Sequence, residues 1–237
     1  MEWLLSNSGM VFERAGQHLA LALIPMVLGL LISVPLAQFA RRNATLRSVV
    51  VTASSLLYTI PSLALFIILP SILGTRILDP VNVIVALTIY AVALLVRAAM
   101  DAFDSVDENL RQAAVAMGYR PAARFLQIDL PLSLPVLFAG LRVVSVSNIS
   151  LVSVAALLGV GNLGMLFTDG LQRTFITEVV VGIVAILLLA LLMDSLLVVL
   201  ERLLTPWTRV SATPSKPAQK SGAEFIAEAR IHAGGGA

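Results

Sequence analysis

Long uninterrupted blocks of apolar residues alternate along this sequence with shorter segments that hold most of the charge. A helix needs about 20 apolar residues to cross the hydrocarbon core of a membrane. Five blocks are long enough to cross, and they span residues 19–40, 49–75, 81–97, 130–164 and 179–204. We therefore expect an all-α integral membrane protein with about five transmembrane helices.

The composition argues against a soluble domain as the main part of the chain. Of the 237 residues, 58% are hydrophobic and only 13% are charged, and the mean hydropathy is +0.94, far above the balance of a soluble protein. We expect an extracytoplasmic segment over 1–17, a transmembrane domain over 18–205 and a cytoplasmic, disordered tail over 206–237, where small and polar residues dominate. Acidic Glu2 and the lack of a basic stretch argue against a cleaved signal peptide.

Positive charge predicts how the helices are oriented. If the N-terminus is outside and the number of crossings is odd, thirteen of the sixteen Lys and Arg residues fall on the inner side. The three that fall outside are Arg14, Arg76 and Arg173. Because cytoplasmic loops carry an excess of Lys and Arg, we expect the N-terminus outside, the C-terminus inside, and the charged segment over about 101–131 in the cytoplasm.

Several kinds of chemistry are excluded by what the sequence lacks. It has no cysteine and two histidines, so we expect neither a disulfide nor a metal site. No glycine is followed by Lys and then Ser or Thr, as in ATPases, so we expect no ATPase activity, catalytic residue or cofactor in this chain. The basic residues lie at helix ends, which argues against nucleic acid as a partner. The glycine-rich stretch 159–164 follows a membrane helix, so we interpret it as a bend.

The charged segment contains a pattern of small and apolar residues at defined spacing. Two short helices are expected to meet at Gly118, since glycine relaxes the turn and Pro121 is favoured at the first position of a helix. Small side chains before the turn would let a partner surface approach closely. The positions of the pattern are Gln112, Ala113, Ala114, Gly118, Ile128, Leu130 and Pro131.

This pattern is similar to the EAA loop of ABC importer permeases, which reads Glu-Ala-Ala, three residues, Gly, nine residues, Ile, one residue, Leu-Pro. Gln112 stands where that family has Glu, which keeps a hydrogen-bonding group but removes a charge. The resemblance implies a MetI-like permease in a bacterial inner membrane, with a cytoplasmic loop that receives the motion of a separate ATPase. It also implies the partners: two nucleotide-binding subunits that hold ATP and magnesium, a second permease, identical or paralogous, and an extracytoplasmic substrate-binding protein.

Other stretches resemble the osmoprotectant permeases, which take up glycine betaine, carnitine, choline or proline. They are residues 58–65, 139–142 and 157–164. Residues 150–153 depart from the Gly-Thr-Ala-Thr stretch usual in that subfamily, so a permease for another small solute, such as methionine or sulfonates, stays open. An ATP-independent channel or secondary carrier is less favoured, because the inverted repeats expected of many carriers are not evident in the sequence.

Polar and charged residues inside the apolar blocks are the remaining candidates. Pro61 removes a backbone hydrogen bond and is expected to kink its helix and expose carbonyl groups. Tyr58, Ser62 and Phe66 would share one helix face, at intervals of four residues, and either line a pathway or pack against a neighbour. Ionisable groups within membranes are costly and often functional. Asp194 is expected to pair with Arg142, either as a structural pair or at a substrate contact, whereas Arg97 is expected to reach the inner membrane surface.

Overall fold

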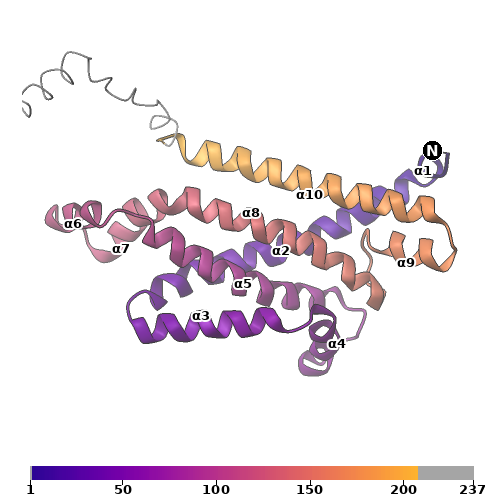
Figure 1. Ribbon diagram of the computed structural model, residues 1–237, viewed down its shortest axis with the longest axis horizontal. Helices are drawn as coiled ribbons and strands as arrows, with labels where there is room; N and C mark the ends of the chain where they lie inside the picture. The colour runs from indigo at the N-terminus through magenta and orange to yellow at the C-terminus, as the bar shows by residue number, and fades with distance from the viewer. Residues whose placement is uncertain (1, 208–237) are drawn as a thin grey trace, which may run out of the picture. The chain divides into compact units, whose positions relative to one another are not determined.

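The computed structural model describes residues 2–207, and within them every regular element is a helix. Residues up to Leu204 form one compact unit, to which the following description applies. Figure 1 shows the order of its helices. They are α1 (Glu2–Ser6), α2 (Ser8–Ala40), α3 (Ala44–Thr59), α4 (Ser62–Leu73), α5 (Pro80–Asp104), α6 (Glu108–Ala116), α7 (Pro121–Arg124), the π-helical η1 (Phe125–Asp129), α8 (Leu130–Val154), the 3-10 turn η2 (Ala155–Leu158), α9 (Met165–Gln172) and α10 (Ile176–Leu204).

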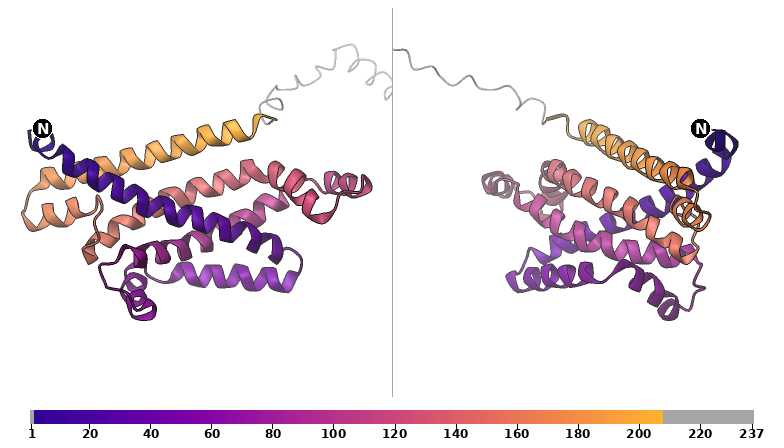
Figure 2. Two further views of the ribbon diagram at one scale, coloured as in Figure 1. Left: turned by 180° about the vertical axis from the view of Figure 1, so that it is seen from behind. Right: turned by 45° about the vertical axis from the view of Figure 1, so that its right-hand side comes forward.

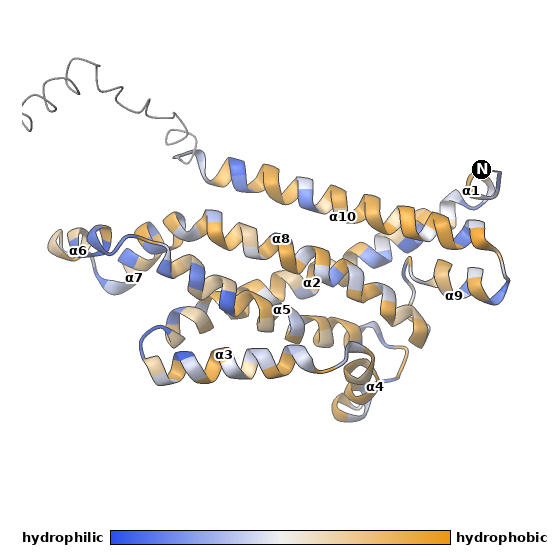
Figure 3. Ribbon diagram, viewed as in Figure 1, coloured by the Kyte–Doolittle hydropathy of each residue, from blue (hydrophilic) through white to orange (hydrophobic). Residues whose placement is uncertain are grey.

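The number of candidate membrane spans agrees with the sequence prediction of about five. Four are single runs of helix long and apolar enough to cross: α2, α5, the run 121–158 that contains α8, and α10. The fifth candidate is the pair α3 and α4, which are bent by 100° relative to each other. Figure 3 shows apolar residues along the middle of these helices and polar residues gathered toward the ends.

Helix α5 lies at the centre of the bundle and α10 at its edge. α5 packs against α2, α3, α4 and α8, and α2 crosses it obliquely (Figure 2). In the most apolar stretch of each helix, 56% of α5 is buried but only 17% of α10. The apolar residues that cover the outside of α10 are therefore available to lipid or to another subunit, as expected in a membrane.

The close approach of α2, α5 and α8 depends on two glycines. A Cβ atom on Gly29 of α2 would lie 2.6 Å from the Cβ of Ala91 on α5. A Cβ atom on Gly140 of α8 would lie 2.4 Å from the Cβ of Ala98, also on α5. Small residues at such crossings let helix backbones approach closely and gain van der Waals contact, which is a main source of helix association in membranes.

The first span begins earlier than the apolar block predicts. Helix α2 starts at Ser8 and has 33 residues, about 50 Å at 1.5 Å per residue. More than half of the segment expected over 1–17 is therefore helical and continuous with the first span, and its extracytoplasmic location stays a prediction. Polar side chains stabilise this extension: Arg14 donates a hydrogen bond to Gln17 (3.1 Å), and Gln17 donates one to Glu13 (3.2 Å).

The second block, expected as one tilted helix over 49–75, is broken at Ile60 and Pro61. Both residues have extended ψ angles near 130°, so α3 ends and α4 starts in a new direction. The Ile60 carbonyl accepts a hydrogen bond from the Tyr90 hydroxyl of α5 (2.5 Å). The Ile60 carbonyl at the break is thus satisfied within this chain.

The bend expected at residues 159–164 is present. Gly159 ends η2 with a φ of 82°, a value that glycine adopts at little cost. The polar link expected between the fourth and fifth spans contains helix α9, which packs against α10. The expected tail over 206–237 lies, from residue 208 onward, outside the described residues.

Candidate functional site

Helix α6 and the turn that follows it form the first half of the expected cytoplasmic loop. Asp107 caps the helix, because its carboxylate accepts a hydrogen bond from the Asn109 amide (2.8 Å). At the other end, the amides of Gly118 and Tyr119 donate to the carbonyls of Val115 (3.0 Å) and Ala114 (3.1 Å). This pair of hydrogen bonds is the Schellman motif, which needs a left-handed residue after the helix. Gly118, with a φ of 81°, is that residue.

The second half of the loop is continuous with a membrane span. Pro121 is in the first turn of α7, as predicted, and α7, η1, α8 and η2 follow one another as one helical run over 121–158. The π-helical turn Phe125–Asp129 lies where this run enters the bundle. No loop therefore separates α7 from α8, and only Tyr119 and Arg120 lie between Gly118 and the start of this run.

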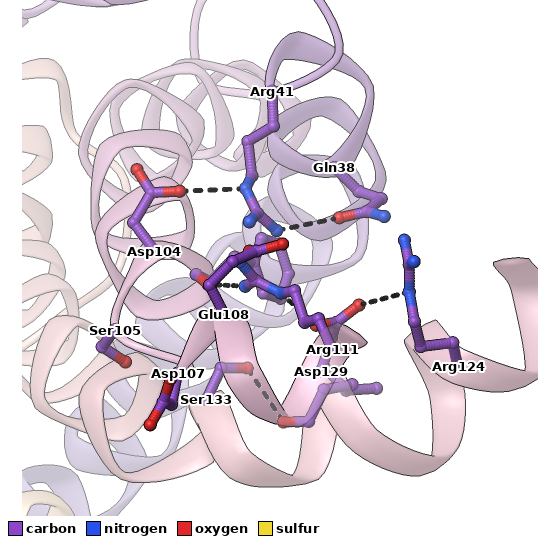
Figure 4. Close-up of polar contacts among 12 residues, drawn as sticks. Gln38, Arg41, Asp104, Ser105, Asp107, Glu108, Arg111, Arg124, Asp129 and Ser133 are labelled. Carbon is purple, nitrogen blue, oxygen red and sulfur yellow. Dashed lines mark hydrogen bonds and ion pairs between the residues drawn. The ribbon is translucent and has the colours of Figure 1, made fainter. Parts of the chain in front are cut away.

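Ion pairs attach α6 to the base of the bundle (Figure 4). Arg111 donates to the Asp129 carboxylate (2.7 Å) and to Glu108 (3.2 Å), and it also donates to the Phe103 carbonyl at the end of α5. Asp129 is only 2% exposed, and a buried carboxylate is costly unless it is paired and hydrogen-bonded. Burial by itself would lower the pKa of Arg111, but its hydrogen bonds to Asp129 and Glu108 raise that pKa above the ordinary value.

A second layer of charge surrounds the end of α5. Asp104 bridges Arg41 (3.0 Å) and Arg47 (2.7 Å), which flank the short connection between α2 and α3. Burial, and then the nearby guanidinium of Arg111, lower the pKa of Arg41. Figure 1 shows α6 and α7 at one end of the unit and α1, α4 and α9 at the other. The arginines of this layer, expected on the inner side, therefore lie together at the end that carries the loop.

The residues of the pattern that precede the turn differ in their exposure to solvent. Gln112 and Ala113 are exposed on α6, where a partner can reach them. Ala114 is 0% exposed, so the expectation that it receives a partner surface is wrong. The hydrogen bond from Arg111 to Asp129 holds this face of α6 against the bundle, and Ala114 lies on that face. Ile128, Leu130 and Pro131 are half-buried where η1 joins α8, which suits a connecting role better than direct docking.

Apolar residues that the sequence pattern did not identify extend the exposed face of the loop. Val115 is 56% exposed, Met117 69% and Leu110 49%. Exposed apolar side chains gathered around small residues are typical of a protein interaction surface. Their spacing along α6 could have suggested this, since Gln112 and Val115 are three residues apart and share a helix face.

The four expected pathway residues do not form one stripe. Tyr58 ends α3, whereas Ser62 and Phe66 belong to α4, and the break at Pro61 lies between them. Phe66 is 0% exposed and belongs to the apolar core of the bundle, so its contact is packing within this chain. Tyr58 is 44% exposed and packs edge-to-face on Tyr90, with ring centroids 5.9 Å apart. A pathway role for Tyr58, Pro61 and Ser62 stays a prediction.

The structure brings Arg142 and Asp194 together. Two hydrogen bonds, of 2.6 and 2.8 Å, join the Arg142 guanidinium on α8 to both carboxylate oxygens of Asp194 on α10. Such a two-pronged pair is a strong and directional contact. Because it joins two spans within one chain, it accounts for both intramembrane charges without a substrate. Arg97 is exposed on α5.

Removing the Asp194 carboxylate should impair folding in the membrane. In Asp194→Ala, Arg142 would remain as an unpaired charge on a membrane span, which is costly, so we expect severalfold less folded protein after purification. The double variant Arg142→Met with Asp194→Leu should recover most of it, since apolar residues can replace such a pair. Gel-filtration yield measures both. Equal loss in the single and double variants would contradict this interpretation, and uptake by a folded double variant would exclude a substrate contact.

Removing the Asp129 carboxylate should release α6. In Asp129→Ala, Arg111 would lose its buried partner, at a cost of about 3 kcal/mol in unfolding free energy. We expect faster amide exchange over 108–116 and a lower thermal midpoint in detergent. The control is Glu108→Ala: that carboxylate is 66% exposed, and exposed pairs contribute less than about 1 kcal/mol. Similar exchange in both variants would show that Asp129 does not hold α6.

A family model for the binding-protein-dependent transport system inner membrane component matches residues 26–208. The chain is also similar to curated proteins over most of its length. It is 34% identical to the osmoprotectant import permease protein OsmW of Salmonella typhimurium over 209 residues, which cover 87% of this chain and 97% of OsmW. It is 30% identical to the choline transport system permease protein OpuBB of Bacillus subtilis over 206 residues, which cover 87% and 94% of the two chains.

Solved structures show the same fold. A chain of the methionine ABC transporter MetNI, in an inward-facing conformation, superposes with a TM-score of 0.74 at 21% identity, over 84% of this chain and 97% of that one. A chain of an amino acid ABC transporter solved with histidines gives a TM-score of 0.70 at 14% identity, over 84% and 96%. At these identities the agreement concerns the fold, which is that of ABC transporter permeases.

Proposed function

This chain belongs to the family of binding-protein-dependent transport system inner membrane components, and we propose that it is the permease subunit of an ATP-driven importer of osmoprotectants of the quaternary-ammonium and proline-betaine type. As a membrane component of a binding-protein-dependent system, it works with a protein that delivers the solute. Its expected place is the bacterial inner membrane. The observation that carries the proposal is the loop of α6 and α7: the exposed helix α6 is joined by the turn at Gly118 to α7, which continues into a membrane span without a break.

The geometry of the loop supports a docking and coupling role. Gln112, Ala113 and the exposed apolar residues of α6 offer a surface to a nucleotide-binding subunit. Arg111 and Asp129 hold that helix to the base of the bundle, and the run 121–158 extends from the turn into the membrane. When two such subunits close on ATP and magnesium, the displacement of α6 would tilt α8 against α5. No covalent chemistry is assigned to this chain.

The choice of solute rests on the relatives. The curated relatives at 30% identity or more over most of this chain include permeases described for osmoprotectants, for choline, for glycine betaine, carnitine and choline, and for carnitine. One further relative, 31% identical over 74% of this chain, is described as an ergothioneine transport permease and binding protein. The methionine transporter shares the fold at only 21% identity, so methionine is the second candidate. Quaternary ammonium groups are bound by clusters of aromatic side chains, and only 6% of this sequence is aromatic. We therefore assign primary recognition of the solute to the extracytoplasmic binding protein.

A second permease, identical or paralogous, would complete the pathway. The unpartnered outer faces of α3 and α10 carry many exposed apolar side chains, and a single set of spans leaves them open. The pathway is expected at the boundary between the two permeases. Tyr58 and Ser62, at the bend between α3 and α4, remain the candidates to line it.

Uptake of radiolabelled glycine betaine tests the proposal. The chain is reconstituted in proteoliposomes with its cognate ATPase, binding protein and any second permease, and uptake is followed with and without ATP. We expect ATP-dependent uptake that unlabelled choline or carnitine reduces and unlabelled methionine does not. Inhibition by methionine alone would reassign the solute. A preparation in which no ATPase co-purifies with the chain would overturn the coupling role.

A further inference from the structure

A polar cavity lies between the end of α2 and the loop that carries α6 and α7. It has a volume of about 250 Å³, room for several molecules of water size at about 30 Å³ each. Gln38, Arg41 and Arg42 line it from α2 and the residues just after it. Arg111 and Arg124 line it from the loop, and Figure 4 shows both on the opposite side from Gln38 and Arg41.

The lining of this cavity carries excess positive charge. Four guanidinium groups line it with two carboxylates, those of Glu108 and Asp129. Arg41 is also paired with Asp104, which it shares with Arg47, so these five arginines and three carboxylates leave two positive charges in excess. Asp129 is already shared, at 2.7 Å from Arg111 and 3.7 Å from Arg124. The lowered pKa of Arg41, caused first by burial and then by Arg111, reflects the same crowding of like charge.

Two of the four arginines have hydrogen-bond donors to spare. Arg42 stacks on the Phe39 ring, 5.1 Å from its centroid, and within residues 2–207 its side chain makes no hydrogen bond or ion pair. Arg124 has only the 3.7 Å contact with Asp129, and its buried Nε lacks a hydrogen-bond partner among the described residues. Buried donors normally find an acceptor, so the Nε of Arg124 is suited to an anion, and Arg42, whose side chain is exposed, adds an unpaired positive charge to the same cavity.

We propose that this cavity binds a phosphate group, presented by an anionic phospholipid or by free phosphate. A guanidinium donates two parallel hydrogen bonds to phosphate oxygens, and two such groups meet the charge and geometry of a phosphate. The cavity lies where α2, a membrane span, ends at Ala40 and where Phe39 is 57% exposed. That is the level of lipid headgroups, and basic pockets between spans on the cytoplasmic side suit anionic headgroups. The site does not depend on which solute is transported.

Lipid binding to the purified full-length chain, in complex with its ATPase, tests this site. The complex is placed in phosphatidylcholine nanodiscs with graded amounts of phosphatidylglycerol, and bound lipid is counted by native mass spectrometry. In Arg124→Gln and Arg42→Gln, we expect roughly tenfold weaker phosphatidylglycerol binding, the effect of one charge-assisted hydrogen bond or more. The matched control is Arg120→Gln, an exposed arginine of the same loop that does not line the cavity. A wild-type thermal midpoint confirms that each variant is folded.

A parallel titration with inorganic phosphate separates the two sources. Selective retention of phosphatidylglycerol identifies a lipid headgroup, whereas protection of the thermal midpoint by phosphate alone identifies the free ion, and either supports the site. Equal binding by wild type, Arg42→Gln and Arg124→Gln would overturn it, as would equal loss in Arg120→Gln. If the two variants lose the ATPase while lipid and phosphate binding are unchanged, the cavity faces an acidic group of that subunit and the proposal is wrong.

Discussion

Replacing Gly118 with valine is expected to lower ATP-dependent uptake strongly while the chain stays folded. The turn requires a φ of 81°, which costs an ordinary L-residue about 1–2 kcal/mol and a β-branched residue more. The Schellman motif would open, so that α6 and α7 lose their relative orientation. Because about 1.4 kcal/mol corresponds to a tenfold change in population, we expect uptake to fall roughly tenfold or more.

The effect of this substitution should come from the backbone of the turn. A Cβ atom at Gly118 would meet nothing of this chain within 4 Å, so valine does not collide with its own fold. Asparagine adopts left-handed φ more readily than other residues, so Gly118→Asn is the matched control and should keep more of the activity. Binding-protein-stimulated ATP hydrolysis and co-purification of the ATPase are measured together with uptake. Wild-type uptake by Gly118→Val would show that the turn geometry does not transmit motion.

Replacing Gly29 with alanine is expected to destabilise the contact of α2 with α5. The new methyl group would lie 2.6 Å from the Cβ of Ala91, so the helices must separate or shift. Overpacking of this kind costs about 1–3 kcal/mol. Thermal unfolding in detergent should therefore show a clearly lower midpoint for Gly29→Ala.

A second substitution tests whether that close contact is the cause. Ala91→Gly removes the methyl group on the opposite helix, so the double variant Gly29→Ala with Ala91→Gly should recover most of the lost stability. Gly16→Ala is the control on the same helix, because a Cβ atom there meets nothing within 4 Å. An unchanged midpoint in Gly29→Ala, or a fall as large in Gly16→Ala, would show that the crossing is not tightly packed.

Most of the span pattern could be predicted because the membrane imposes it. A span must be long and apolar, so hydropathy located the starts of α5, α8 and α10 to within three residues, although α5 ends seven residues after its block and α8 ends ten residues before the end of its block. Hydropathy did not show the break at Pro61, because it does not register backbone direction; the kink expected there came from the proline itself. Residues on both sides of the break are apolar, and the hydrogen bond that satisfies Ile60 comes from Tyr90 on another helix.

The sequence predicted the spacing of the residues in the loop but not which side of α6 faces outward. The glycine and proline of the loop have local conformational preferences, so Gly118 and Pro121 indicated the turn and the start of α7. Whether Ala113 or Ala114 faces outward depends on how α6 is held to the bundle. That is decided by the contact of Arg111 with Asp129, eighteen residues later in the chain.

The sequence by itself determined a helical membrane protein, its charge asymmetry and a loop of defined spacing, because each follows from local composition or from contacts between near neighbours. Only the tertiary structure decided what depends on distant residues meeting. It set the break between α3 and α4, the burial of Ala114 and Phe66, and the cavity at the end of α2. Arg42 and Arg124 both line this cavity, although they are more than eighty positions apart in the sequence. Such meetings depend on helix packing, which the order of apolar blocks does not specify.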